Sequence, residues 1–145
     1  AAFFAIIAIS NKTSSEQISD FAGMSRRAPY VAFALALALV ALVGVPPTGI
    51  FIAKLYIFTA AVNSDLLWLA IVGVVNSVVS AYYYLRVVRV MYLGVASSEE
   101  AIPSSWPVRL SLALTGGSIL AIGLLPGLLL KLSEAAVQIF SLTPQ

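Results

Sequence analysis

The sequence has 145 residues, of which 61% are hydrophobic and 10% are charged, and its formal net charge is +2. Soluble domains carry roughly 25% charged residues, so this composition predicts an integral membrane protein. The small and scattered positive charge excludes a nucleic-acid-binding protein. Without Cys or His, the chain also lacks the usual ligands of zinc, haem and iron–sulfur clusters, and we expect it to bind no cofactor and no metal.

The chain begins with an apolar run and continues with a polar stretch. Residues 1–9 are too few to cross a ~30 Å hydrocarbon core, which takes about 20 residues, so we expect them to end a truncated helix of a longer protein. Residues 10–29 are expected to form a loop. Part of this loop is typical of a helix at the membrane surface, because three apolar residues share one face: Ile18, Phe21 and Met24.

A long apolar run over residues 30–62 is predicted to be one broken transmembrane helix. As a continuous helix it would be about 50 Å long and would overshoot the bilayer. The predicted break, at residues 44–49, contains four residues that disfavour a continuous helix: Gly44, Pro46, Pro47 and Gly49. Because lipid does not tolerate exposed non-helical backbone, the break should be buried in protein or line a hydrated cavity. The alternative is two short helices joined by a turn outside the membrane.

Two further transmembrane helices are predicted after the broken one. Residues 66–93 form an apolar span with aromatic residues near both ends, as suits the two membrane interfaces. Residues 94–105 form a polar loop, and residues 106–125 form the last transmembrane helix. Residues 126–145 are a C-terminal extension, and the sequence leaves open whether it stays in the membrane or lies along its surface.

The distribution of basic residues predicts the orientation in the membrane. Six of them fall on one side: Lys12, Arg26, Arg27, Arg86, Arg89 and Arg109. Only Lys131 falls on the other side. By the positive-inside tendency, the loops 10–29 and 94–105 should be cytoplasmic and the C-terminus should face the opposite compartment. We expect the membrane to be that of a prokaryotic cell or the inner membrane of an organelle.

Lys54 is a charged residue inside a predicted span. It precedes the end of that span by eight residues, or about 12 Å, which is close to the centre of a ~30 Å core. A mid-membrane lysine costs roughly 2.5–3.5 kcal/mol and usually faces a bundle interior or a water path. Because the surroundings of a buried amine can change its proton affinity, we predict that Lys54 is a proton carrier. The alternatives are an amine extended to the headgroups and a static ion pair with an acid outside this sequence.

Two other polar residues are weaker candidates for the same path. Thr48 is a candidate water site, although hydroxyls in membrane helices more often bond to their own helix. Tyr82, Tyr83 and Tyr84 point in three successive directions around the predicted helix, so at most two can face inward. Tyr83 is the candidate relay, and the alternative is an aromatic belt or a core contact.

Three strings of the sequence resemble a known family. Residues 43–56, VGVPPTGIFIAKLY, resemble the GIPPTAGFxxKF stretch of antiporter-like subunit N (mitochondrial subunit 2 type) of the proton-pumping NADH–quinone oxidoreductase, respiratory complex I. Residues 76–86, NSVVSAYYYLR, are similar to the NSxxSxYYYLR segment of that subunit, and residues 20–24, DFAGM, are similar to its DxxGL loop. The glycine of the family's AGF triplet is shifted by one residue, to Gly49.

The resemblance implies an all-α integral membrane protein that forms the C-terminal helices of an antiporter-like bundle, including one broken transmembrane helix. It implies that Lys54 belongs to a mid-membrane relay of a proton-translocating subunit, which does no redox chemistry and has no activity alone. The NADH-type donor, flavin, iron–sulfur clusters and quinone would be bound by other subunits. The expected partners are other membrane subunits, including homologous antiporter-like ones, and the lipid bilayer.

Two other functions stay open at this point. The chain could belong to a cation/proton antiporter or to a membrane-bound hydrogenase-related complex, in which Lys54 would serve ion exchange. It could also be a structural membrane subunit whose Lys54 is held in a static ion pair.

Overall fold

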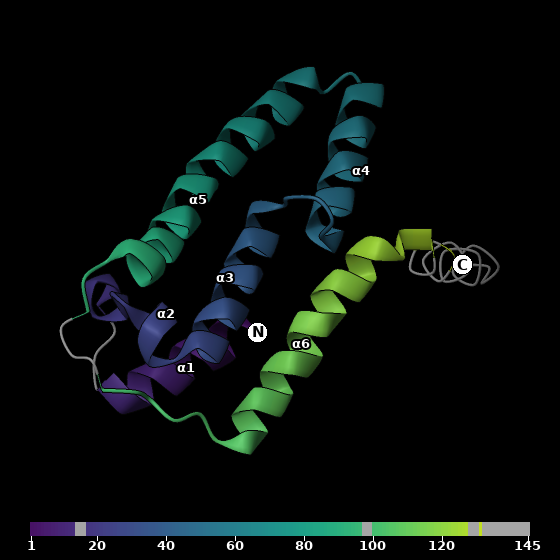
Figure 1. The fold of residues 1–145 in the computed structure, drawn as a ribbon. Helices are drawn as coiled ribbons and strands as arrows, with labels where there is room; N and C mark the ends of the chain where they lie inside the picture. The colour runs from purple at the N-terminus through teal and green to yellow at the C-terminus, as the bar shows by residue number, and fades with distance from the viewer. Residues whose placement is uncertain (14–16, 97–99, 128–130, 132–145) are drawn as a thin grey trace, which may run out of the picture.

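A computed structural model describes residues 1–13, 17–96, 100–127 and 131, and every regular element in these ranges is helical. The elements are α1 (Ala2–Thr13), the 3-10 helix η1 (Ile18–Phe21), α2 (Met24–Arg27), α3 (Pro29–Val43), α4 (Gly49–Asn63), α5 (Leu67–Leu93) and α6 (Trp106–Leu124). Figure 1 shows a bundle in which α4 and α5 form an antiparallel pair and α6 runs beside α3. The predicted all-α fold class is confirmed.

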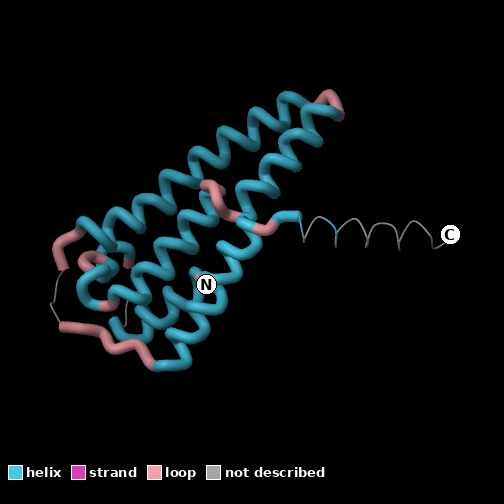
Figure 2. Tube along the Cα trace, turned by 45° about the vertical axis from the view of Figure 1, so that its right-hand side comes forward, coloured by secondary structure: helices cyan, strands magenta, loops and turns pink. Residues whose placement is uncertain are grey.

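α3 lies at the centre of the bundle and contacts each of the other α-helices. In Figure 2 it runs between α5 and α6. It begins at Pro29, a residue that fits the first position of a helix because its missing amide hydrogen would have no partner there. Buried alanines, including Ala32, Ala34 and Ala38, occupy the middle of α3. Small side chains allow neighbouring helices to approach closely, so α3 can be surrounded on several sides.

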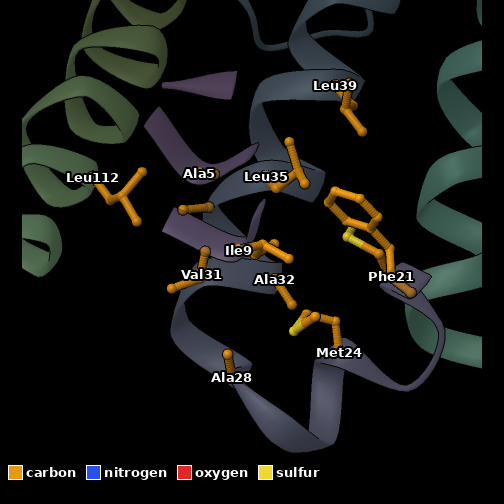
Figure 3. Packing of buried hydrophobic residues seen from close by; sticks show 12 residues of the cluster. Ala5, Ile9, Phe21, Met24, Ala28, Val31, Ala32, Leu35, Leu39 and Leu112 are labelled. Atoms are coloured by element: carbon orange, nitrogen blue, oxygen red, sulfur yellow. The ribbon is translucent and has the colours of Figure 1, made fainter. Parts of the chain in front are cut away.

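The hydrophobic core is built around the N-terminal half of α3. Figure 3 shows Leu35 of α3 packed with Ile9 of α1 and with Phe21 and Met24 from the segment between the two helices. Met91, near the end of α5, is also fully buried. In contrast, α4 contains no buried residue within its described length. The segment from α1 to α3 therefore anchors the bundle together with the end of α5, and α4 extends away from this core.

The predicted surface helix within residues 10–29 is wrong in its orientation. Gly23 has a φ of +66°, a left-handed conformation that separates η1 from α2. Phe21 and Met24 are buried, with exposures of 5% and 0%, whereas Ile18 is 43% exposed. This segment therefore closes one end of the bundle with its apolar side chains instead of presenting them to lipid.

Several element boundaries differ from the expected ones. α1 continues to Thr13, because Ala5 and Ile9 anchor it in the core and the polar residues extend the same helix. The non-helical connection after α3 ends at Thr48, since Gly49 is already the first residue of α4. α6 ends at Leu124, and most of the predicted C-terminal extension (128–130 and 132–145) lies outside the described residues.

Within the described ranges, α5 and α6 are the helices long and apolar enough to cross a membrane. α3 and α4 are apolar but have only 15 residues each. The surface of α5 is rich in exposed apolar side chains, such as Trp68 and Val78, with exposures of 62% and 66%. Such a surface suits contact with lipid or with helices outside this chain rather than with water.

The packing of α3 gives a test of the core. Leu35 is fully buried and Leu42, on the same helix, is 39% exposed. Replacing a buried leucine with alanine leaves a cavity and typically costs about 2–5 kcal/mol. We expect Leu35→Ala to lower the thermal midpoint of the membrane complex that contains this chain clearly more than Leu42→Ala does. Equal decreases of the thermal midpoint in the two variants would contradict the placement of Leu35 in the core and of Leu42 outside it.

Candidate functional site

The candidate site is the non-helical connection between α3 and α4. α3 ends at Val43, and Gly44 follows with a φ of +84°, a conformation that ends helices and favours glycine. The amide of Gly44 donates a hydrogen bond to the carbonyl of Ala41 (2.9 Å), and the amide of Thr48 donates one to the carbonyl of Val45 (3.0 Å). The Pro46–Pro47 peptide bond lies inside this second turn and is cis. The connection is thus an ordered double turn.

Lys54 of α4 folds back onto this connection. Its amine nitrogen Nζ donates a hydrogen bond to the backbone carbonyl of Val43, with an N···O distance of 2.8 Å. The side chain is half-buried, and it passes directly over Gly44. Lys54 therefore joins the first turns of α4 to the last residue of α3.

The Val43 carbonyl is a suitable acceptor for a positive group. The last carbonyls of a helix have no partner inside the helix, and together they carry the negative end of the helix dipole. An ammonium at this point satisfies an unpaired acceptor and is stabilised by the dipole. In the part of the chain that is described, no carboxylate pairs with Lys54. The amine is turned back toward the end of α3 instead of extending along α4.

α6 packs against the outer side of the connection. A side chain at Gly123 would overlap the carbonyl oxygen of Pro47, and one at Gly49 would overlap the Ile122 side chain. Thr48, between these contacts, is only 3% exposed. Close helix approach is thus possible only because both glycines lack a Cβ, and the connection is buried in protein on this side.

A pocket of about 410 Å³ adjoins the connection. Its lining comes mostly from α1, α3, α4 and α6 and includes the polar residue Thr48. The lining residues are Ala1, Ala2, Phe3, Ala38, Ala41, Leu42, Thr48, Gly49, Ile50, Ala53, Ile119 and Ile122. The Thr48 hydroxyl donates a hydrogen bond to the Val45 carbonyl (2.7 Å). Apart from Thr48 the side chains of the lining are apolar, so most of this pocket is suited to apolar contact.

The tyrosines of α5 differ in their surroundings. Tyr82 and Tyr83 are 66% and 60% exposed and contact each other edge to face, with ring centroids 5.6 Å apart. Tyr84 is half-buried and packs against the core. Tyr84 is therefore the tyrosine that faces into this chain, while the candidate relay Tyr83 lies on the outer surface of α5.

The hydroxyls nearby on α5 bond to their own helix. Ser77 donates a hydrogen bond to the Gly73 carbonyl and Ser80 donates one to the Asn76 carbonyl, both at 2.9 Å. This is the common use of hydroxyls in membrane helices. Among the described residues, no three His, Cys, Asp or Glu side chains gather into a candidate metal site.

Two features of the site were not named from the sequence. One is the Val43 carbonyl. The predicted helix break could have pointed to it, because a break leaves backbone carbonyls without a partner inside the helix. The other is the contact of Gly123 with Pro47, where the absence of a Cβ lets α6 approach the connection. Both depend on the path of the chain between helices, which composition does not give.

Comparison with known proteins identifies the family. The sequence profile of the family described as "NADH:quinone oxidoreductase/Mrp antiporter, TM" matches residues 1–80. The chain belongs to this family. The sequence-based resemblance is confirmed at this level.

Relatives of this antiporter family match most of the chain. NADH-quinone oxidoreductase subunit N of Dehalococcoides mccartyi is 46% identical over 138 residues, covering 95% of this chain and 28% of the relative. The subunit of the same name from Coxiella burnetii is 42% identical over 123 residues, covering 84% of this chain and 26% of the relative. The chain therefore spans about a quarter of the length of these relatives.

A solved structure shares the fold. One chain of respiratory complex I from Thermus thermophilus with bound aureothin superposes with a TM-score of 0.69 at 30% sequence identity. The match covers 79% of this chain and 26% of that one. Together with the family match, it identifies this chain as part of an integral membrane protein.

The contact between α6 and the connection gives a second test. We expect Gly123→Ala to push α6 away from Pro47, because the added methyl group would overlap the carbonyl oxygen. Overpacking of this kind typically costs about 1–3 kcal/mol, and it should lower the thermal midpoint of the assembled complex. Gly117→Ala, on the same helix, is the matched control, because a methyl group there meets no atom within 4 Å. An equal effect of both variants would contradict the contact.

Proposed function

We propose that this chain is the C-terminal part of subunit N, of the mitochondrial subunit 2 type, in a proton-translocating NADH–quinone oxidoreductase, and that Lys54 is a protonatable group in its mid-membrane relay. The observation that carries the proposal is the 2.8 Å hydrogen bond from Lys54 to the Val43 carbonyl at the interrupted helix. The family and the relatives named subunit N support the assignment to this complex.

The neutral partner of Lys54 suits a proton carrier. A carboxylate partner would favour the charged form strongly, and removal of the proton would leave a buried negative charge without its pair. A carbonyl is neutral, and both an ammonium and a neutral amine keep an N–H group that can donate to it. Lys54 can therefore gain and lose a proton while the bond that joins α3 and α4 is retained.

α3 and α4 together suit a single membrane crossing. Each has 15 residues and would be about 22 Å long, which is short of a ~30 Å core. The two helices run in the same direction (Figure 1), and Thr48 of the connection between them is buried where α6 packs against it. One broken crossing, with Lys54 near its centre, accounts for both observations.

The other parts of the proposal follow from this assignment. The chain has no redox activity by itself, and the donor, flavin, iron–sulfur clusters and quinone belong to other subunits. Its partners are membrane subunits, including homologous antiporter-like ones, and lipid. The basic side of the bundle, with Arg26, Arg27 and Arg109, faces the cytoplasm, and the C-terminus faces the opposite compartment. Tyr83 and Thr48 stay candidates for a relay residue and a water site.

A cation/proton antiporter subunit is the second candidate function, because the family description itself includes Mrp antiporters. The two candidates differ in the ion that is exchanged. In membrane vesicles, proton movement that depends on NADH oxidation and not on sodium supports the oxidoreductase. Proton movement that requires sodium and continues without NADH would favour the antiporter.

Substitution of Lys54 tests its role. We expect Lys54→Met to leave the complex assembled and its NADH oxidation measurable, while proton pumping per electron falls severely, because the methionine carries no proton. Lys54→Arg should also fail to restore pumping, because a guanidinium keeps its proton under all physiological conditions. Leu55→Met, one residue further along α4 and 48% exposed, is the matched control.

A structural lysine gives the opposite pattern. If Lys54 only holds α3 and α4 together, arginine retains the charge and the donors, so Lys54→Arg should assemble and pump normally. Lys54→Met should then lose assembly together with activity. Normal pumping in Lys54→Arg would therefore reject the proton-carrier role.

A further inference from the structure

We propose that Gly44 positions Lys54: because this residue has no Cβ, the lysine side chain can fold back over it and rest its amine on the end of α3. Gly44 would thus decide where the protonatable group sits when it is not engaged elsewhere. The inference rests on the proposed role of Lys54 and adds a positioning residue to it.

The space above Gly44 is filled by Lys54 itself. A Cβ on Gly44 would lie 3.1 Å from Cδ, 3.3 Å from Nζ and 3.4 Å from Cε of the lysine. These are closer than ordinary van der Waals contacts, which lie near 3.5–4.0 Å. Three consecutive heavy atoms of one flexible side chain would be crowded together. The lysine side chain would have to shift by a few tenths of an ångström, which strains its hydrogen bond to the Val43 carbonyl.

The backbone conformation of Gly44 contributes a second effect. Its φ of +84° ends α3 at Val43, and its amide turns back to the carbonyl of Ala41. The Val43 carbonyl is then free to accept the hydrogen bond from Lys54. The same glycine therefore presents the acceptor and leaves the room for the donor.

Gly44 differs from the other described glycine with a positive φ in the atoms that a Cβ would meet. Gly23 also has a positive φ, +66°, but a Cβ there would meet Ala96. The crowding at Gly23 therefore involves an alanine and not a titratable residue. At Gly44, the nearest atoms all belong to the residue proposed to carry the proton, so a substitution should affect Lys54 as well as the turn.

The first experiment measures proton pumping per electron in the full-length subunit within its assembled membrane complex. We expect Gly44→Ala to retain NADH oxidation and to lower pumping about threefold, since a ~1 Å misplacement of a reacting group can cost ~10²-fold and the shift of the lysine is a few tenths of an ångström. Gly117→Ala, where a methyl group meets open space, should pump normally. Normal pumping in Gly44→Ala would overturn the inference.

Gly44→Asn distinguishes displacement of Lys54 from a folding defect of the turn. Asparagine adopts a positive φ more readily than alanine, but it still brings a Cβ next to Lys54. We expect Gly44→Asn to assemble and to show the same loss of pumping. Assembly with normal pumping would show that only the turn matters.

A double-mutant cycle separates the two effects of Gly44. The thermal midpoint of the complex is compared for Gly44→Ala in the Lys54 background and in a Lys54→Ala background. Strain in the turn is present in both, but only the first has a lysine to displace, so we expect the larger decrease there. Equal decreases would reject the positioning role.

Failure of the inference is distinguishable from failure of the proposed function. If Lys54→Met pumps normally, the proposed function fails and Gly44 has no carrier to position. If Lys54→Met abolishes pumping while both Gly44 variants pump normally, the function stands and only the positioning role is rejected.

Discussion

The hydrogen bond between the Lys54 amine and the Val43 carbonyl is the interaction on which the site depends. It joins two helices that the sequence interrupts, and it places a titratable group at the negative end of a helix dipole. The rest of the bundle keeps this bond in place. α3 is fixed by the core at its N-terminal end, so its last carbonyl has a defined position. α6 covers the connection through Gly123, which limits how far α4 can move from α3.

The two ends of the molecule have different physical characters. The core around Leu35 and Met91 is closed by η1 and α2, and its side chains are buried within the chain itself. α4 and most of α5 expose apolar side chains and depend on lipid or neighbouring helices for their environment. The connection near Lys54 lies between these regions. A protonatable group at such a boundary is anchored on one side and can respond to its neighbours on the other.

The sequence predicted the all-helical membrane character from composition, and the structure has a non-helical connection that contains Gly44, Pro46 and Pro47 between α3 and α4. It did not predict the partner of Lys54, because the direction of the Val43 carbonyl depends on the dihedral angles of Gly44 and on the path of α4. The left-handed turn at Gly23 was missed for a related reason: one glycine split a segment that otherwise has helical periodicity. Which tyrosine faces inward depends on the rotation of α5 relative to α3, which no local pattern contains.

Solid-state NMR of the assembled complex in lipid tests the central claim most directly. The dipolar coupling between the ¹⁵Nζ of Lys54 and the carbonyl ¹³C of Val43 reports whether the two groups are in contact, and the ¹⁵N shift reports the protonation state of the amine. We expect a strong coupling that corresponds to a hydrogen-bonded pair and persists while the shift changes between the two protonation states. A weak coupling in both states, or an amine that never changes its protonation, would contradict it.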